Sequence, residues 1–201
     1  LPSGFVAVFA EDLKLLAEQH PDLVLETISS GQIADLQRGD ADLALRIGPI
    51  QDQDLVARSL GDVGSSLCAS PRYLQNHPTP VDLSNLRGHS VVAFGTDLST
   101  LPAARWLEER TDQVKVVLRT NEIVAMLEAA VSGAGLAMLP CMIADADPRL
   151  VRITPDVLAR RGLSLVYRRE LRSGREVRIV ANFLIKALRT RSDRITGSPR
   201  G

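Results

Sequence analysis

The chain has 201 residues, of which 45% are hydrophobic, so it can bury a substantial core as one domain or as two small ones. Lysine plus arginine and aspartate plus glutamate both number 24, which makes the formal net charge zero. Without an overall positive field, the chain alone is expected to be a poor DNA binder. No apolar run approaches the roughly 20 residues that span a bilayer, so membrane insertion is excluded at this level.

The cysteines and the first residues bear on the cellular compartment. Cys68 and Cys141 lack C-x-x-C spacing and lie in apolar surroundings, as is typical of small core residues in a reducing cytoplasm; a single structural disulfide stays an alternative. The opening "LPSGFVAVFA" has no basic region before its apolar residues, so it does not resemble a secretory signal. A cytoplasmic location is therefore expected.

The first quarter of the chain predicts alternating helix and strand. Apolar side chains recur at helical spacing until Pro21, which disfavours helical geometry in the residue before it. Gly39 is a suitable residue to end a second, shorter helix. The predicted elements are a helix over 5–20, a strand over 23–28, a helix over 32–39 and a strand over 41–48. A strand, a helix and a strand in this order favour a right-handed crossover, and hence a parallel sheet in an α/β fold.

The same alternation restarts near residue 66. Pro71 and Pro102 suit the first turns of helices, and a connector with two prolines precedes the third strand of this region. The predicted strands cover 55–60, 65–70, 90–94, 114–120 and 135–140, and the predicted helices cover 71–77, 101–110, 122–133 and 173–191. The polar tail from Ser192 is expected to fray.

Arg46 is an unusual residue for the strand in which it lies. Strands of parallel sheets are usually covered on both faces, so a charged side chain there needs a partner. Ligands of open α/β sheets bind outside the carboxyl ends of strands, which makes Arg46 a candidate contact for an anion or a carboxylate. An internal salt bridge with Asp42 or Asp52, or a solvated strand end, explains the residue equally well.

Serines stand at or just before the predicted starts of three helices, in the segments "LPSG", "TISSG" and "DLST". Free backbone N–H groups and a partial positive charge at such starts can complete a site for a carboxylate or another polar ligand. For any one of Ser3, Ser30 and Ser99, plain capping of the helix is the commoner role. Together with Arg46, the three favour a ligand-binding cleft.

No catalytic or metal-binding motif is visible. The segment "SGAG" at 132–135 follows a helix and precedes a strand, which is the wrong order for a nucleotide-binding glycine loop; it predicts a tight helix end with close packing. His20, His77 and His89 lack metal-ligand spacing, and no serine has the G-x-S-x-G pattern of a hydrolase nucleophile. No metal, no cofactor and no enzymatic activity are expected.

Three longer segments resemble the effector-binding region of LysR-type transcriptional regulators. They are "HPDLVLETISSGQIADLQRGDADLALRIGP", "LCASPRYLQNHPTPVDLSNLRGH" and "NEIVAMLEAAVSGAGLAMLP", and their order and spacing also match, so the resemblance covers nearly the whole chain. It implies two α/β subdomains, joined by two crossover strands as in type 2 periplasmic binding proteins. Subdomain I would comprise residues 1–65 and 170–201, and subdomain II residues 66–169.

The resemblance also implies a function and a site. The chain would be a ligand-sensing domain without catalytic activity, with a small polar or anionic effector in the cleft between its subdomains. The family's effector contacts, together with Arg46, make a set of seven candidate residues. These are Ser3, Ser29, Ser30, Arg46, Thr96, Ser99 and Thr100.

The resemblance further implies a homodimer or tetramer, in which the first helix of one subunit meets the second subdomain of another. The family's N-terminal winged helix-turn-helix and a strand before the first helix are both missing from these residues, so DNA would be bound only through that missing domain. Two alternatives remain: a solute-binding protein of a transporter, which shares the fold, and an enzyme on the same scaffold, which would need a cleft residue with a perturbed pKa.

Overall fold

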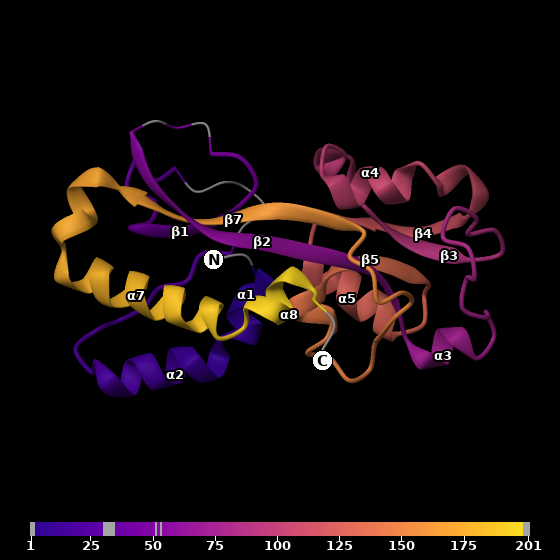
Figure 1. The fold of residues 1–201 in the computed structure, drawn as a ribbon, viewed down its shortest axis with the longest axis horizontal. Helices are drawn as coiled ribbons and strands as arrows, with labels where there is room; N and C mark the ends of the chain where they lie inside the picture. The colour runs from indigo at the N-terminus through magenta and orange to yellow at the C-terminus, as the bar shows by residue number, and fades with distance from the viewer. Residues whose placement is uncertain (1–2, 30–34, 51, 53, 199–201) are drawn as a thin grey trace. The chain divides into compact units, whose positions relative to one another are not determined.

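A computed structural model describes residues 3–29, 35–50, 52 and 54–198 (Figure 1). The chain divides into two compact units. Unit 1 runs from the N-terminus to Asp62 and from Arg161 to Ser192, and unit 2 runs from Val63 to Arg160 and resumes at Asp193. The subdomain boundaries expected from the sequence differ from those of the units. The expected subdomains are 1–65 with 170–201 and 66–169, whereas the units change after Asp62, Arg160 and Ser192. Among the described residues no helix is long and apolar enough to cross a membrane.

The strands form one parallel group in unit 2 and several antiparallel pairs. They are β1 (Leu43–Ile47), β2 (Leu55–Ala69), β3 (Ser90–Phe94), β4 (Lys115–Thr120), β5 (Leu136–Pro140), β6 (Val151–Arg152) and β7 (Ala159–Arg168). In unit 2, β3 pairs in parallel with both β4 and β5, while β2 pairs antiparallel with β5 and β6. In unit 1, β1 pairs antiparallel with β7. The predicted α/β fold class is confirmed.

The helices are mostly short. The α-helices are α1 (Ser3–Val8), α2 (Ala10–Gln19), α3 (Pro71–Leu74), α4 (Pro102–Glu108), α5 (Ile123–Val131), α6 (Cys141–Ala144), α7 (Arg175–Arg189) and α8 (Ser192–Thr196). The part of the chain that the structure describes also contains the 3₁₀ turns η1 (Thr96–Leu98), η2 (Thr111–Gln113) and η3 (Arg169–Ser173). Pro71 and Pro102 occupy first helical positions as predicted, because a helix leaves that N–H without an internal partner in any case.

The central strands β3 and β5 of unit 2 are buried on both faces, as is usual for strands inside a parallel sheet. Along β3 the side chains alternate between two apolar clusters. Val91 and Ala93 pack with Tyr73 on one face, and Val92 and Phe94 pack with α4 and α5 on the other. This strand is therefore fixed from both sides, and its carboxyl end presents the following loop in a defined position.

In unit 1, the helices α1, α2 and α7 each carry buried apolar side chains. The rings of Phe5 and Phe9 are almost fully buried, with their centroids 5.8 Å apart. The end of α7 is joined to α2 by Arg191, whose guanidinium binds both carboxylate oxygens of Asp12. The predicted single helix over 5–20 is interrupted at Phe9, where φ is −101° and ψ is 9°, so that two helices result.

Several predicted elements of unit 1 are wrong. Residues 23–28 form an irregular segment in place of the predicted strand, and Val24 is 90% exposed. Of the predicted helix 32–39, residues 32–34 lie outside the described residues, and 36–39 form a turn whose N–H groups bind the carboxylate of Asp35. The described residues of this region show no parallel crossover, and β1 is instead paired antiparallel with β7, far along the chain.

Two further predictions need correction. The two strands predicted over 55–60 and 65–70 are one continuous strand, β2. Gly61 lies within it with a φ of +102°, a conformation that glycine adopts without ending the strand. The tail from Ser192 is not frayed as far as it is described, since it begins with α8 and its Ile195 is only 3% exposed. An isolated polar tail is expected to be mobile, but these residues find a packing site on unit 2.

Candidate functional site

In unit 2, the candidate residues Thr96, Ser99 and Thr100 lie together in the loop that follows β3. Thr96 begins η1, Ser99 ends it, and all three side chains are exposed. The loop is fixed at its first residue, because the N–H of Gly95 donates to the carbonyl of Thr120 at the end of β4, 2.9 Å away. Three hydroxyl groups are thus available at the carboxyl end of a buried strand, which is where open α/β sheets bind ligands.

Two residues that the sequence did not single out as ligand contacts belong to the same place. The amide of Asn121, directly after β4, donates to the carboxylate of Asp97 in η1, 3.1 Å away. Gly95 allows this arrangement, because a Cβ there would lie 2.6 Å from Asp97 Oδ1. The position of Asn121 directly after a predicted strand could have indicated this contact. β3 and β4 are neighbouring parallel strands, so the residues that follow their carboxyl ends lie close together.

In unit 1, Arg46 lies one residue before the end of β1, opposite Ser164 of β7. Its side chain is half-buried, and it shares a face of the strand with Ala44, which packs against the cluster of Leu36, Leu55 and Val166. The sequence offered Asp42 and Asp52 as salt-bridge partners of Arg46. In the structure, Asp42 Oδ1 lies 3.9 Å from Arg168 Nη2, and Asp52 Oδ2 accepts a hydrogen bond from Gln37 Nε2. The role of Arg46 in ligand binding stays a prediction.

The serine candidates of unit 1 are described to different degrees. Ser3 is the first residue of α1, as expected for a helix start, but its side chain lies outside the described part. Ser29 is exposed at the end of the irregular segment after α2, and Ser30 lies outside the described residues. The structure therefore brings together the three candidates of unit 2, whereas those of unit 1 stay separate predictions.

A second arginine of unit 1 lies beside the end of β1. The guanidinium of Arg161 packs on Gly48, whose φ is +113°, and a Cβ at Gly48 would come within 3.0 Å of Arg161 Cζ. Burial lowers the pKa of Arg161, since a desolvated guanidinium is less favourable as a cation. A partly buried positive charge at a strand end has the chemistry to hold an anionic group.

Metal binding and catalysis by a cysteine thiol have little support in this structure. Within the described residues, no group of three or more histidines, cysteines and carboxylates could hold a metal ion. Cys68 and Cys141 are free thiols with no exposed surface, and burial raises the pKa of both. Thiols of this kind are weak nucleophiles, because the thiolate is the reactive form.

Comparison with known proteins agrees with this fold. A family model, the LysR substrate binding domain, matches residues 6–189. The HTH-type transcriptional regulator CrgA of Neisseria meningitidis serogroup C is 29% identical over 182 residues, which cover 85% of this chain and 59% of the relative. The regulator PtxR of Pseudomonas aeruginosa is 32% identical over 143 residues, covering 68% of this chain and 46% of the relative. The chain thus spans about half the length of the curated relatives it matches.

Solved structures show the same architecture. The regulatory domain of CrgA from Neisseria meningitidis superposes with a TM-score of 0.78 at 23% identity, covering 93% of this chain and 95% of that one. The effector domain of AmpR from Pseudomonas aeruginosa superposes with a TM-score of 0.73 at 17% identity, covering 95% and 94%. The fold is the type 2 periplasmic-binding-protein-like fold of such domains. The chain therefore belongs to the LysR substrate binding domain family, the effector-binding part of LysR-type transcription regulators.

Proposed function

We propose that this chain senses a small polar or anionic effector for a DNA-binding regulator. The observation that carries the proposal is the loop after β3, where Thr96, Ser99 and Thr100 are exposed beside the Asp97–Asn121 pair at one edge of a buried sheet. Such a set of fixed donors and acceptors suits a ligand with several polar groups. The effector would bind between the two subdomains, with Arg46, Ser3, Ser29 and Ser30 contributing from subdomain I.

The proposed domain binds its ligand without transforming it. The polar loop of unit 2 has hydroxyl, amide and carboxylate groups, but no histidine or cysteine lies in it to activate a nucleophile. The similarity to named transcriptional regulators favours this function over that of a transporter's solute-binding protein. The proposed setting is the bacterial cytoplasm, where such a regulator meets both its effector and its DNA.

Signalling requires that the effector prefer one arrangement of the protein. A ligand that binds two arrangements equally shifts neither population, so the effector must have a higher affinity for one arrangement of the subdomains. The relay would run through a homodimer, or a tetramer built from such dimers, to DNA-binding domains carried on the full-length chain. The isolated 201 residues should then show no sequence-specific retention of DNA.

Exposed apolar side chains indicate where the dimer would form. On unit 2, Val117 and Leu118 of the edge strand β4 are each 40% exposed, and Val124 of α5 is 44% exposed. On unit 1, Leu15 of α2 is 51% exposed. Edge strands with exposed apolar residues favour association, and a two-fold contact would bring α2 of one subunit to β4 and α5 of the other.

Thermal melting against a metabolite library tests the sensing function, since a ligand of the native state raises the melting temperature. For a hit, Ser99→Ala and Arg46→Ala should each weaken binding about tenfold or more, which corresponds to the loss of one hydrogen bond to a charged group. Ser84→Ala, an exposed serine of the connector before β3, is the matched control. Unchanged affinity in both site variants would place the site elsewhere.

Sedimentation tests the dimer. At micromolar concentration the chain should sediment as a dimer, and Leu118→Glu should convert it to a monomer, because a charge would be buried at the contact. Val81→Glu provides the control, since Val81 is fully exposed in the connector and far from β4 in sequence. A wild-type chain that sediments only as a monomer would contradict the proposed relay.

A further inference from the structure

The last described residues, 193–198, pack on unit 2, although α7 just before them belongs to unit 1. We call this segment the C-terminal latch. It contains most of α8 and closes on itself, because the N–H of Ser198 donates to the carbonyl of Asp193, 2.9 Å away. Ile195 and Gly197 are buried, so the latch is a packed part of unit 2.

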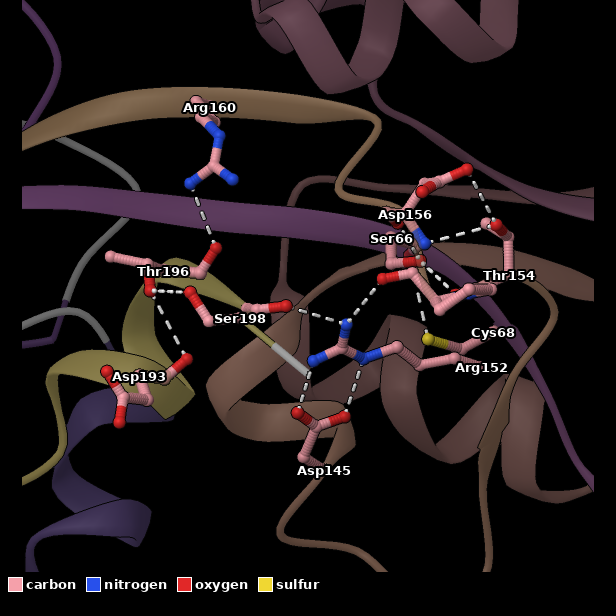
Figure 2. Close-up of polar contacts among 12 residues, drawn as sticks. Ser66, Cys68, Asp145, Arg152, Thr154, Asp156, Arg160, Asp193, Thr196 and Ser198 are labelled. Atoms are coloured by element: carbon pink, nitrogen blue, oxygen red, sulfur yellow. Dashed lines mark hydrogen bonds and ion pairs between the residues drawn. The ribbon is translucent and has the colours of Figure 1, made fainter. Parts of the chain in front are cut away.

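Two arginines of unit 2 hold the backbone of the latch (Figure 2). Arg160 Nη1 donates to the carbonyl of Thr196 at 3.1 Å, and Arg152 Nη1 donates to the carbonyl of Gly197 at 3.0 Å. Arg152 is itself fixed by Asp145, whose Oδ1 accepts from Nε at 2.8 Å. The last carbonyls of a helix have no partner within it, and cations are favourable at that end.

Two glycines permit the close contact between the latch and unit 2. A Cβ at Gly64 of β2 would overlap the carbonyl group of Thr196. Gly197 has a φ of +77°, and a Cβ there would lie 2.6 Å from the sulfur of Cys141 and 2.8 Å from Val157 Cγ2. The backbone of the latch thus lies directly on β2 and on Cys141, with no room for a side chain at either contact.

The two buried thiols differ in what covers them. Cys141, the first residue of α6, lies against Gly197 of the latch. Cys68 lies inside β2, and its side chain is packed in the core cluster that contains Met126, Met138 and Ala144. Opening the latch would uncover Cys141, whereas Cys68 would stay covered until that core itself came apart.

We propose that residues 193–198 dock on unit 2 as a detachable latch, which opens as one segment and uncovers Cys141 while the sheet around Cys68 stays folded. The segment is a short helix outside the sheet, and two of its polar contacts to unit 2 are made by the side chains of Arg152 and Arg160. Segments of this kind open locally at a lower free energy than the whole domain.

The latch is tested by the rate at which a maleimide labels each cysteine in the full chain, followed by peptide mass spectrometry. Gly64→Ala places a methyl group against the carbonyl of Thr196 and should raise labelling of Cys141 about tenfold or more. Arg160→Ala removes one of the two backbone contacts and should raise it in the same direction, without a steric clash in the sheet. Labelling of Cys68 should not change in either variant.

Gly162→Ala is the matched control, because a Cβ on that strand glycine would have only one neighbour within 4 Å, at 3.9 Å. Its labelling rates should equal those of the wild type. If Cys141 is labelled at the wild-type rate in Arg160→Ala, or if Cys68 becomes reactive together with Cys141, the latch does not open as a separate segment and the proposal is wrong. Should Gly64→Ala fail to fold, Arg160→Ala decides alone.

Discussion

Gly135 should be among the most sensitive positions of unit 2, and its replacement by alanine tests the packing described above. A Cβ at Gly135 would meet the carbonyl of Ser90 and come within 3.0 Å of the N atom of Val91, both in the backbone of β3. That backbone cannot easily move, because β3 is paired with β4 on one side and β5 on the other, and the N–H of Ser90 also donates to Tyr73 Oη at 2.8 Å.

The magnitude follows from two opposing effects. Forcing an extra methyl group into a packed site lowers the free energy of unfolding by about 1–3 kcal/mol. The cost lies toward the upper end of this range where the neighbour is backbone, because backbone cannot rotate away. Replacing glycine lowers the entropy of the unfolded chain, which returns about 0.4–1 kcal/mol. The free energy of unfolding of Gly135→Ala should therefore fall by about 2 kcal/mol, and the melting temperature by about 4–8 °C.

Urea unfolding followed by circular dichroism measures this difference, with Gly162→Ala as the control that should change stability little. A Gly135→Ala protein as stable as the wild type would refute the argument that close approach to β3 requires a glycine. The same variant should also weaken ligand binding, because β3 carries the loop with Thr96 and Ser99.

Two further predictions concern charges in the two units. Burial, with a smaller contribution from His77, lowers the pKa of His89 below its ordinary value of 6.5. The folded protein then binds a proton on His89 less well than the unfolded chain does. The free energy of unfolding therefore has its full value above pH 6.5 and decreases as the pH falls from 6.5 through the lowered pKa. His89→Gln should flatten that part of a curve of stability against pH. In unit 1, Arg191→Ala leaves Asp12 without its guanidinium and should lower the free energy of unfolding by about 1–3 kcal/mol, measured by urea unfolding.

A pH curve as steep in His89→Gln as in the wild type would show that another group causes the acid loss. For Arg191, the conservative variant Arg191→Lys should recover only part of the stability, because a lysine cannot bind both oxygens of Asp12 through two parallel hydrogen bonds. Full recovery by lysine would mean that charge alone holds α7 to α2.

Much of unit 2 could be predicted from the sequence, because its elements have strong local signals. The strand over 90–94, the helices begun by Pro102 and by residues 122–123, and the glycine turn at 133 are all present, and Gly133 has the positive φ of +87° expected at a helix end. The loop candidates Thr96, Ser99 and Thr100 came from the resemblance to the family, and Ser99 also from its position before a predicted helix. The family, too, was evident from the order and spacing of three segments.

The sequence by itself therefore determined the family, the α/β class and the local elements with clear periodicity. Only the tertiary structure decided that 23–28 is irregular, that β1 pairs with β7, that Asn121 holds Asp97, and that α8 of the polar tail packs on unit 2. The physical reason is that periodicity records which face of a segment is apolar, whereas pairing depends on partners far away in the chain. Alternation can therefore predict a strand at 23–28 without recording whether a neighbouring strand is there to pair with it.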